Sequence, residues 1–541
     1  MADDKGAKDA SGTSTVMESN QDEAGLARMG YKQELKRDLG LMQNFGVSFS
    51  IISVITGISS LFLYGLTTGG PAVMVWGWIV VVASPSMLHH VSRFVDGCAH
   101  PTSGGPYFWA AMLCKPEHAA FSSWITGWFN LLGQVAVTTG ISFACATFIS
   151  TLATFNTSFV PSAPRTIGIY AAVLSAQGLI NTFGVHLLRY LNNVSVWWNA
   201  LGTTALGIAV LAAAPTHQSA HFVFQTFIDG TGVDGVGWAQ RASPAYVVII
   251  GILMAQYTLL GYDASAHMTE ETHNAAMSGP LGIVMAIGVS AVLGWFLILA
   301  LLFSIQDLET TLAPPSGEPI AQIFLDTVGE KGAIVLMVIV IGAIFWCGVF
   351  SVTSNSRMMY AFARDGGIPG HKFFHKVDQK RRSPVRTVWL ACTLSFILGL
   401  PSLGSAVAFS AATSIATIGL YISYGIPIAL RVIYAPRFVR GPFHLGAFSY
   451  PIATGAVLWI IFITIAFVLP EENPVNSQTL NYAIVAVGIV VTYSLGFWLV
   501  SARRWFTGPV KQIEAEAQGV DVMNGGDIEN GKRLSEGEGS V

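Results

Sequence analysis

A short polar stretch, GYDASAHMTEET at residues 261–272, follows a long apolar run. It carries Asp263, His267 and Glu270, whose side chains can take up or release a proton. A carboxylate inside a membrane costs a few kcal/mol by insertion scales, and such residues usually mark a pathway or a proton relay. These three residues are therefore our candidates for a coupling or gating site.

Simpler interpretations of the same stretch remain open at this point. Asp263 can lie at the inner membrane interface and cap the helix that follows it. His267 can be a local hydrogen-bonding residue. Glu270 and Glu271 can be solvated cytoplasmic charges.

The composition places these residues in a membrane protein. The chain has 541 residues, of which 52% are hydrophobic and only 11% are charged, and its mean hydropathy is +0.56. Soluble domains carry about 25% charged residues. The formal net charge of -3 argues against a nucleic-acid binder.

Apolar runs of about 20 residues, the length that crosses a bilayer, predict twelve spans. They lie near residues 45–66, 72–92, 121–153, 166–184, 192–213, 244–263, 281–305, 331–361, 385–400, 404–430, 449–469 and 480–502. Basic residues concentrate on cytoplasmic segments, and of the 28 Lys and Arg residues only Arg165, Arg241 and Lys331 fall elsewhere. We therefore expect both termini in the cytoplasm.

The segments outside the spans have their own predictions. Residues 1–40 and 506–541 read as disordered cytoplasmic tails around a transmembrane domain at 41–505. An NTS sequon at Asn156, in a predicted outer loop, is a possible glycosylation site. The cysteine pattern predicts neither a disulfide framework nor a metal site, and no motif predicts a cofactor.

Two spans are interrupted where a simple anchor would be continuous. The first contains Thr56, Gly57, Ile58, Ser59 and Ser60 near its middle, and the sixth contains Gly261 near its inner end. Paired broken helices at matching positions of two inverted repeats indicate a midplane binding site in secondary transporters. The alternative is that small residues only allow close helix packing.

Further polar residues follow span eight, in the basic loop at residues 354–384. Arg357, Arg364 and Asp365 lie nearest the span and suit either an inner gate or structural ion pairs. The other basic residues suit topology and contact with anionic lipid headgroups.

Four stretches together resemble the amino acid-polyamine-organocation superfamily and, within it, the fungal amino acid/choline transporters that include GABA and choline permeases. The stretches are TGISSLFLYGLTTGGPAVMVWGW at span one, SGGPYFW after span two, GYDASAHMTEET at span six and SRMMYAFARDGGIP after span eight. They follow the family order over residues 40–505.

The resemblance implies an all-α fold of about twelve spans. It has an inverted five-plus-five repeat, at about 45–213 and 244–430, with discontinuous spans one and six, and two further helices at about 449–502. It also implies that amides of the unwound part of span one hold a substrate carboxylate and that backbone carbonyls of span six face the amine. The implied substrate-binding residues are Thr56, Gly57, Ile58, Ser59, Tyr257, Thr258, Leu259, Leu260 and Gly261.

The expected function is that of a plasma-membrane permease, not an enzyme, that imports a small amino acid or an amine such as GABA. Proton symport is favoured, although span five lacks the lysine that some proton-coupled relatives carry. Ser351, Thr353 and Ser354 are the alternative, as hydroxyl ligands for sodium. The sequence leaves the oligomeric state undetermined.

Other cargoes, and a receptor function without transport, remain open as interpretations of this sequence. A choline or polyamine carrier, a carrier of a specialised nitrogenous metabolite and a non-transporting receptor would share this fold. Choline would need an aromatic cage. The aromatic residues available in spans are Trp124, Trp128, Trp197, Trp198, Trp346 and Tyr421.

Overall fold

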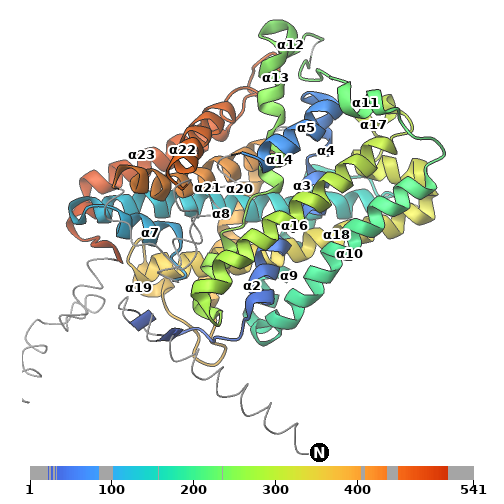
Figure 1. Cartoon of the computed structure of the whole chain (residues 1–541). Helices are drawn as coiled ribbons and strands as arrows, with labels where there is room; N and C mark the ends of the chain where they lie inside the picture. The colour runs from blue at the N-terminus through green and yellow to red at the C-terminus, as the bar shows by residue number, and fades with distance from the viewer. Residues whose placement is uncertain are drawn as a thin grey trace, which may run out of the picture.

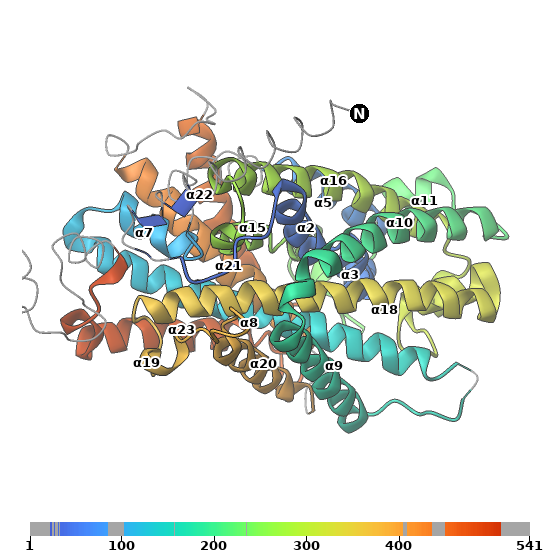
Figure 2. The ribbon, with the colours of Figure 1, turned by 90° about the horizontal axis from the view of Figure 1, so that it is seen from below.

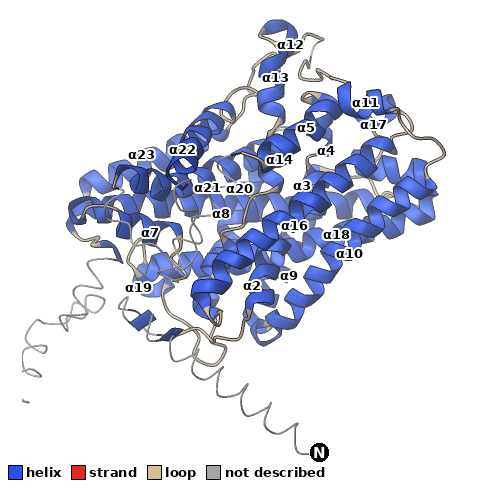
Figure 3. Ribbon diagram, in the orientation of Figure 1, coloured by secondary structure: helices blue, strands red, loops and turns tan. Residues whose placement is uncertain are grey.

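The computed structural model of the chain is built almost wholly of helices, as Figures 1 and 3 show. The structure describes residues 22–23, 26–27, 31, 33–84, 102–155, 157–233, 235–403, 408–434 and 449–509. Within these ranges there is no β-strand, only isolated bridges. Helices satisfy their backbone polar groups internally, as hydrocarbon requires. The predicted all-α membrane fold is confirmed.

Among the described residues, twelve apolar helical segments, some of them divided by breaks, lie at the positions of the predicted spans. The main helices are α2 (Leu41–Ile52), α3 (Val54–Ser60), α4 (Phe62–Thr67), α5 (Gly70–Val82), α8 (Pro116–Leu152), α9 (Ala163–Phe183), α10 (Leu188–Ala213), α13 (Pro244–Gly251), α14 (Leu253–Thr258), α16 (Ala275–Phe303), α18 (Pro319–Arg364), α20 (Val385–Gly399), α21 (Ala408–Ile433), α22 (Ser449–Ala466) and α23 (Ala483–Val500). Ten described segments are long and apolar enough to cross a membrane, with α2 and α3 counted together. The two shorter apolar segments are α5 and the pair α13 and α14.

Short helices connect these segments. They are α7 (Pro106–Leu113), η1 (Val185–Leu187), α11 (Ala220–Gln225), α12 (Trp238–Arg241), α15 (Ala264–His267), η2 (Thr269–Glu271), α17 (Leu308–Leu312), α19 (His371–Phe374), η3 (Leu400–Leu403) and η6 (Ala502–Arg504). Inside α18, Gly329 has a non-helical backbone (φ 69°, ψ 174°), so the span proper begins after it.

The long helices α8 and α18 form the centre of the bundle and contact each other, as the view in Figure 2 illustrates. The most apolar stretch of α8 is 78% buried, whereas that of α23 is only 11% buried. An apolar helix with so little burial must face lipid. The polar residues of α8 therefore belong to the interior of the protein.

Spans one and six are both broken, and their outer halves α3 and α14 pack against each other (Figure 1). Ser53 separates α2 from α3, with φ 23° and ψ 84°. Gly261 interrupts span six with φ +89°. Both spans are thus interrupted in the interior of the bundle, although the break in span one does not fall on the residues predicted for it.

The N-terminal segment differs from the disordered tail that the sequence predicts for residues 1–40. Tyr31, Leu35 and Leu39 are at most 6% exposed. Leu39 also pairs with Thr272 in an isolated bridge. The reason is that these apolar side chains bury surface against the helices, which sequence composition does not reveal. Asn156 and the tail from residue 510 lie outside the described residues.

Candidate functional site

The break in span one lies at Ser53, three residues before the predicted segment. Its hydroxyl accepts a 3.4 Å hydrogen bond from the Thr56 amide and donates a 2.7 Å bond to Asn199 Oδ1 on α10. Ser53 therefore caps α3 and satisfies a backbone amide that the break frees.

The predicted unwound residues of span one are helical instead. Thr56, Gly57, Ile58 and Ser59 all belong to α3. A Cβ added to Gly57 would lie 2.7 Å from the Thr258 Cα, so this glycine allows close approach of α14. The prediction for these four residues is corrected because glycine serves packing here and a serine makes the break.

In span six the break begins at Leu259. Tyr257 and Thr258 are the last residues of α14, and α15 begins only at Ala264. The predicted irregular backbone is therefore found at Leu259, Leu260 and Gly261. It is not found at Tyr257 and Thr258, which are helical. A φ of +89° is readily adopted by glycine alone, which explains why the chain turns at Gly261.

A small cavity lies where the two breaks meet. Its volume is about 10 Å³, roughly that of one water probe. Five predicted substrate residues line it, namely Thr56, Gly57, Tyr257, Thr258 and Leu260. The predicted residues Ile58, Ser59, Leu259 and Gly261 are not part of its lining. The centre is therefore closed to anything as large as an amino acid.

A larger cavity of about 400 Å³ begins at Ser60, the last residue of α3, at the end of the bundle that the sequence predicts to face outward. Glu318, Glu471 and Glu472 line it, and none of its lining residues is Lys or Arg. Burial raises the pKa of Glu471 to about 7 and that of Glu318 to about 8. Both pKa values rise because no cation compensates the loss of water.

Asp263 lies in the break of span six and is fully buried. Its Oδ2 accepts hydrogen bonds from Gln134 Nε2 at 2.9 Å and from Asn130 Nδ2 at 3.3 Å, both on α8. The carboxylate makes no capping hydrogen bond to α15. The helix-capping interpretation of Asp263 is thereby excluded.

His267 joins Asp263 one helical turn further on. Its Nε2 lies 3.2 Å from Asp263 Oδ2, and its Nδ1 lies 2.8 Å from the Ser103 carbonyl. A carbonyl only accepts hydrogen bonds, so Nδ1 must carry hydrogen. A hydrogen bond between Nε2 and Oδ2 requires a hydrogen on one of these two atoms. The contact between the two buried side chains is therefore a place where a proton can sit.

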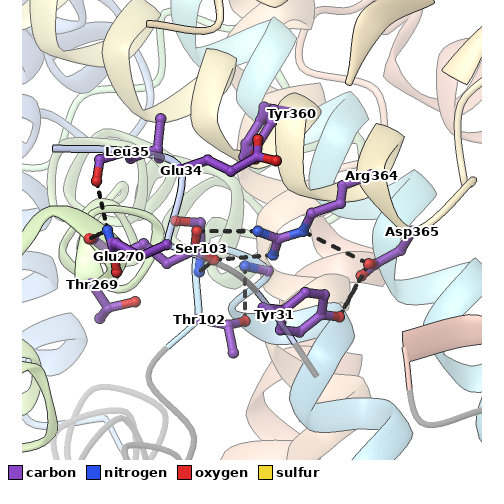
Figure 4. Close-up of polar contacts among 12 residues, drawn as sticks. Tyr31, Glu34, Leu35, Thr102, Ser103, Thr269, Glu270, Tyr360, Arg364 and Asp365 are labelled. Atoms are coloured by element: carbon purple, nitrogen blue, oxygen red, sulfur yellow. Dashed lines mark hydrogen bonds and ion pairs between the residues drawn. The ribbon is translucent and has the colours of Figure 1, made fainter. Parts of the chain in front are cut away.

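Glu270 and Glu271 are buried and ion-paired, so their interpretation as solvated charges is wrong. Arg364 makes two hydrogen bonds of 3.0 and 3.1 Å to the Glu270 carboxylate, as Figure 4 shows. Arg357 Nε donates to Glu271 Oε1 at 2.8 Å. Burial tends to raise the pKa of Glu270, but Arg364 outweighs it and holds that pKa below the usual value.

A second cluster ties the N-terminal segment to the end of α18. The Tyr31 hydroxyl donates to the Asp365 carboxylate at 3.0 Å (Figure 4). The Tyr107 hydroxyl donates to the same carboxylate at 2.8 Å. The Arg364 guanidinium lies 3.9 Å from the centre of the Tyr31 ring. Burial raises the pKa of Asp365 to about 6 despite Arg364 and the two hydroxyls. Arg364 and Asp365 thus take part in ion pairs and hydrogen bonds, as the structural alternative from the sequence expects, and a gating role for them stays a prediction.

Sequence reasoning missed three of these partners. Asn130 and Gln134 lie one turn apart in an apolar span, and such intramembrane polar residues are a usable signal. Tyr31 gave no signal beyond being an aromatic residue in a polar segment. Its partner Asp365 is 334 residues away in the chain.

Comparisons with known proteins agree with this architecture. The family profile described as amino acid permease matches residues 39–491. The chain belongs to the amino acid permease family. The resemblance inferred from the four sequence stretches is thereby confirmed, and the protein is a multi-pass permease of the membrane.

Individual relatives extend over nearly the whole chain. The amino-acid permease BAT1 of Arabidopsis thaliana is 43% identical over 92% of this chain and 98% of its own length. Its homologue in Oryza sativa subsp. japonica is 44% identical over 91% and 96%. Amino-acid permease 2 of Neurospora crassa is 29% identical over 93% and 91%.

The aromatic residues considered for a quaternary-ammonium cage do not surround the permease's central cavity. None of the six lines it. Trp124 and Trp128 lie 5.7 Å apart and pack against α23, and Trp197 is 64% exposed. Tyr421 instead makes an edge-on contact with Tyr424, with the ring centres 6.1 Å apart.

The hydroxyl residues of span eight point to different helices. Ser351 Oγ lies 2.9 Å from Thr138 Oγ1 on α8. Thr353 Oγ1 donates to Asn181 Oδ1 on α9 at 2.6 Å. These two hydroxyls therefore act as contacts between helices.

Proposed function

We propose that this permease is a secondary active transporter that imports a small amino acid or a related amine such as GABA by alternating access. A closed centre of about 10 Å³ lies beside a larger cavity of about 400 Å³ toward the predicted outer side. Such an arrangement suits a carrier that opens to one side at a time. We place it in the plasma membrane with both termini in the cytoplasm.

The substrate site is proposed at the meeting point of the two breaks. Thr56 and Gly57 contribute one wall of the central cavity, and Thr258 and Leu260 contribute the other. The amino group would meet carbonyls of the irregular segment around Gly261, because that segment lies outside the helices. Opening this site requires α3 and α14 to separate.

Proton coupling is proposed to run through Asp263 and His267. The observation that carries this proposal is the 3.2 Å contact between His267 Nε2 and Asp263 Oδ2, two fully buried groups beside the break. Because Nδ1 of His267 faces a carbonyl, this contact holds one exchangeable proton. Movement of α15 when the substrate site opens would expose the pair to water. Glu270 has a gating role in this scheme, since it is held by Arg364.

Uptake in cells that lack their own carriers tests the proposal. Labelled GABA, proline, a basic amino acid, choline and a polyamine are compared at two external pH values. We expect saturable uptake of one cargo that rises at acid pH. Asp263→Asn should abolish that uptake, while Glu309→Gln, at an exposed outer carboxylate, should leave it unchanged.

Two outcomes would contradict the proposal. Uptake by Asp263→Asn with its pH dependence intact would show that the proton does not pass through this pair. If no cargo moved although the protein reached the cell surface, transport of this cargo class would be refuted and a receptor function favoured. His267→Gln sharpens the test, because Gln can donate to the Ser103 carbonyl but cannot carry the proton.

A further inference from the structure

A basic cavity of about 430 Å³ opens at the inner end of the bundle, between α2, the start of α10 and the loop before α20. Its basic lining residues are Lys36, Arg189, Lys380, Arg381 and Arg382. All five are exposed at the rim. The cavity is large enough for a small ligand headgroup.

A tight loop presents three of these side chains in succession. Asp378 Oδ1 accepts hydrogen bonds from the Lys380 and Arg381 amides at 3.0 and 2.9 Å. The Asp378 amide donates to the Ser383 carbonyl at 3.0 Å and closes the loop. Arg382 has a φ of 48°, a left-handed conformation that is unfavourable for a residue with a Cβ. The loop is therefore held in one shape by its hydrogen bonds.

The acidic residues near the cavity do not neutralise it. Asp38 is paired with Lys36, and Glu271 is paired with Arg357, which is outside the lining. Arg381 is paired with Asp378. Within the part of the chain that the structure describes, no ion pair engages the remaining three cations, which are Arg189, Lys380 and Arg382. An excess of positive charge therefore faces the cavity.

The floor beneath this basic rim is apolar. Leu39, Val47, Leu188, Met268 and Phe350 line the cavity, are at most 6% exposed and belong to one hydrophobic cluster. Large apolar side chains continue outward from the same corner at the ends of α9 and α10. They are exposed, as membrane-facing residues are: Phe183 57%, Leu187 44% and Tyr190 66%. The cavity thus combines a cationic rim with an apolar floor, and exposed apolar side chains lie next to its lining residues in the chain.

We propose that this cavity binds a phosphate-bearing anion, supplied by the headgroup of an anionic phospholipid of the cytoplasmic leaflet. Basic pockets between membrane helices on that side bind such headgroups. The apolar floor favours a lipid over a free phosphate because it can also cover the start of an acyl chain. This assignment depends on the cytoplasmic orientation of the inner face and does not depend on the transported cargo.

Binding there would link two parts of the inner face. Lys36 belongs to the N-terminal segment, and Lys380 and Arg382 belong to the loop before α20. A phosphate contacted by both would hold the N-terminal segment and α2 against the loop. The lipid therefore stabilises the closed inner end.

Lipid binding to the purified full-length protein tests this site. The triple variant Arg189→Gln, Lys380→Gln, Arg382→Gln is compared with wild type. The matched control is Arg503→Gln, Arg504→Gln, which removes two exposed cations of the same face outside the cavity. With the protein in one detergent, affinity is measured for phosphatidylcholine, for phosphatidylserine and for inorganic phosphate.

We expect wild type and the control variant to bind phosphatidylserine more tightly than phosphatidylcholine. The triple variant should lose on the order of 100-fold in that affinity, because each basic residue near an anionic surface contributes about fivefold. Equal losses in the triple and control variants would overturn the site. If inorganic phosphate bound with the same affinity as the lipid, the proposal that a lipid headgroup supplies the anion would be overturned. Since no transport is measured, the result is independent of the proposed function.

Discussion

Two buried glutamates at opposite ends of the permease have opposite charge preferences. Glu270, at the inner end, is fully buried and bound by Arg364, which holds its pKa below the usual value. Glu471, at the outer end, is 7% exposed and accepts hydrogen bonds from Ser414 and Asn481, each at 3.2 Å. Its pKa rises to about 7 because burial is not compensated by a cation. Burial alone therefore does not determine charge; the partner does.

The two ends of the proposed transport path therefore differ in whether a cation accompanies their buried carboxylates. The inner end is closed by ion pairs, Glu270 with Arg364 and Glu271 with Arg357. The outer cavity contains carboxylic groups that ionise near neutral pH. In the proposed transport cycle, an ammonium group in the outer cavity would be attracted more strongly as the pH rises, whereas opening the inner end would require ion pairs to separate.

The largest expected effect comes from removing the cation at the inner end. Arg364→Met leaves Glu270 buried without its partner, which typically destabilises a protein by about 3–5 kcal/mol. We expect a lower melting temperature of the purified protein and less protein at the cell surface. Arg503→Met, at an exposed arginine, is the matched control and should change neither.

The double variant Glu270→Gln, Arg364→Met separates loss of the pair from loss of packing. With no buried charge left, it should recover part of the melting temperature. If the single Arg364→Met variant were as stable as wild type, the conclusion that Arg364 compensates the buried charge of Glu270 would be contradicted.

A smaller, pH-dependent effect is expected at Glu471. Its pKa in the folded protein, about 7, lies above the ordinary value of 4.5. Between these values the folded state keeps a proton that the unfolded chain has lost, so stability falls as the pH rises through this window. The fall is at most about 3 kcal/mol.

Melting temperatures measured at about pH 5 and about pH 8 test that sign. Glu471→Gln cannot ionise and should lose less stability than wild type between the two pH values. Glu309→Gln, an exposed outer carboxylate, should behave like wild type. An identical pH dependence in Glu471→Gln and wild type would show that Glu471 is already charged, as Glu270 is.

The smallest effect is expected where the N-terminal segment joins the inner end. Tyr31→Phe removes one of the two hydroxyl donors to Asp365, which should weaken docking of residues 33–40 by about 1 kcal/mol. Faster hydrogen exchange in that segment would report the loss. Tyr190→Phe, at a 66% exposed tyrosine, should leave exchange unchanged. Unchanged exchange in Tyr31→Phe would mean that this segment is held by its apolar contacts alone.

The helices and the break at Gly261 were predictable because they depend on local properties of the chain. A run of about 20 apolar residues must span or be buried, and a glycine among polar residues ends a helix readily. The predicted break in span one began three residues too late, because a glycine can allow close packing as well as unwinding. Only the position of Thr258 against Gly57 distinguishes these uses.

The sequence by itself determined that this chain crosses a membrane repeatedly, that spans one and six are interrupted and that Asp263 lies beside a break. The tertiary structure alone decided which carboxylates are charged, that Asn130 and Gln134 hold Asp263, and that the inner cavity is basic. The physical reason is distance along the chain. Glu270 and Arg364 are 94 residues apart, and a charge is set by its neighbours in space, which hydropathy and spacing do not encode.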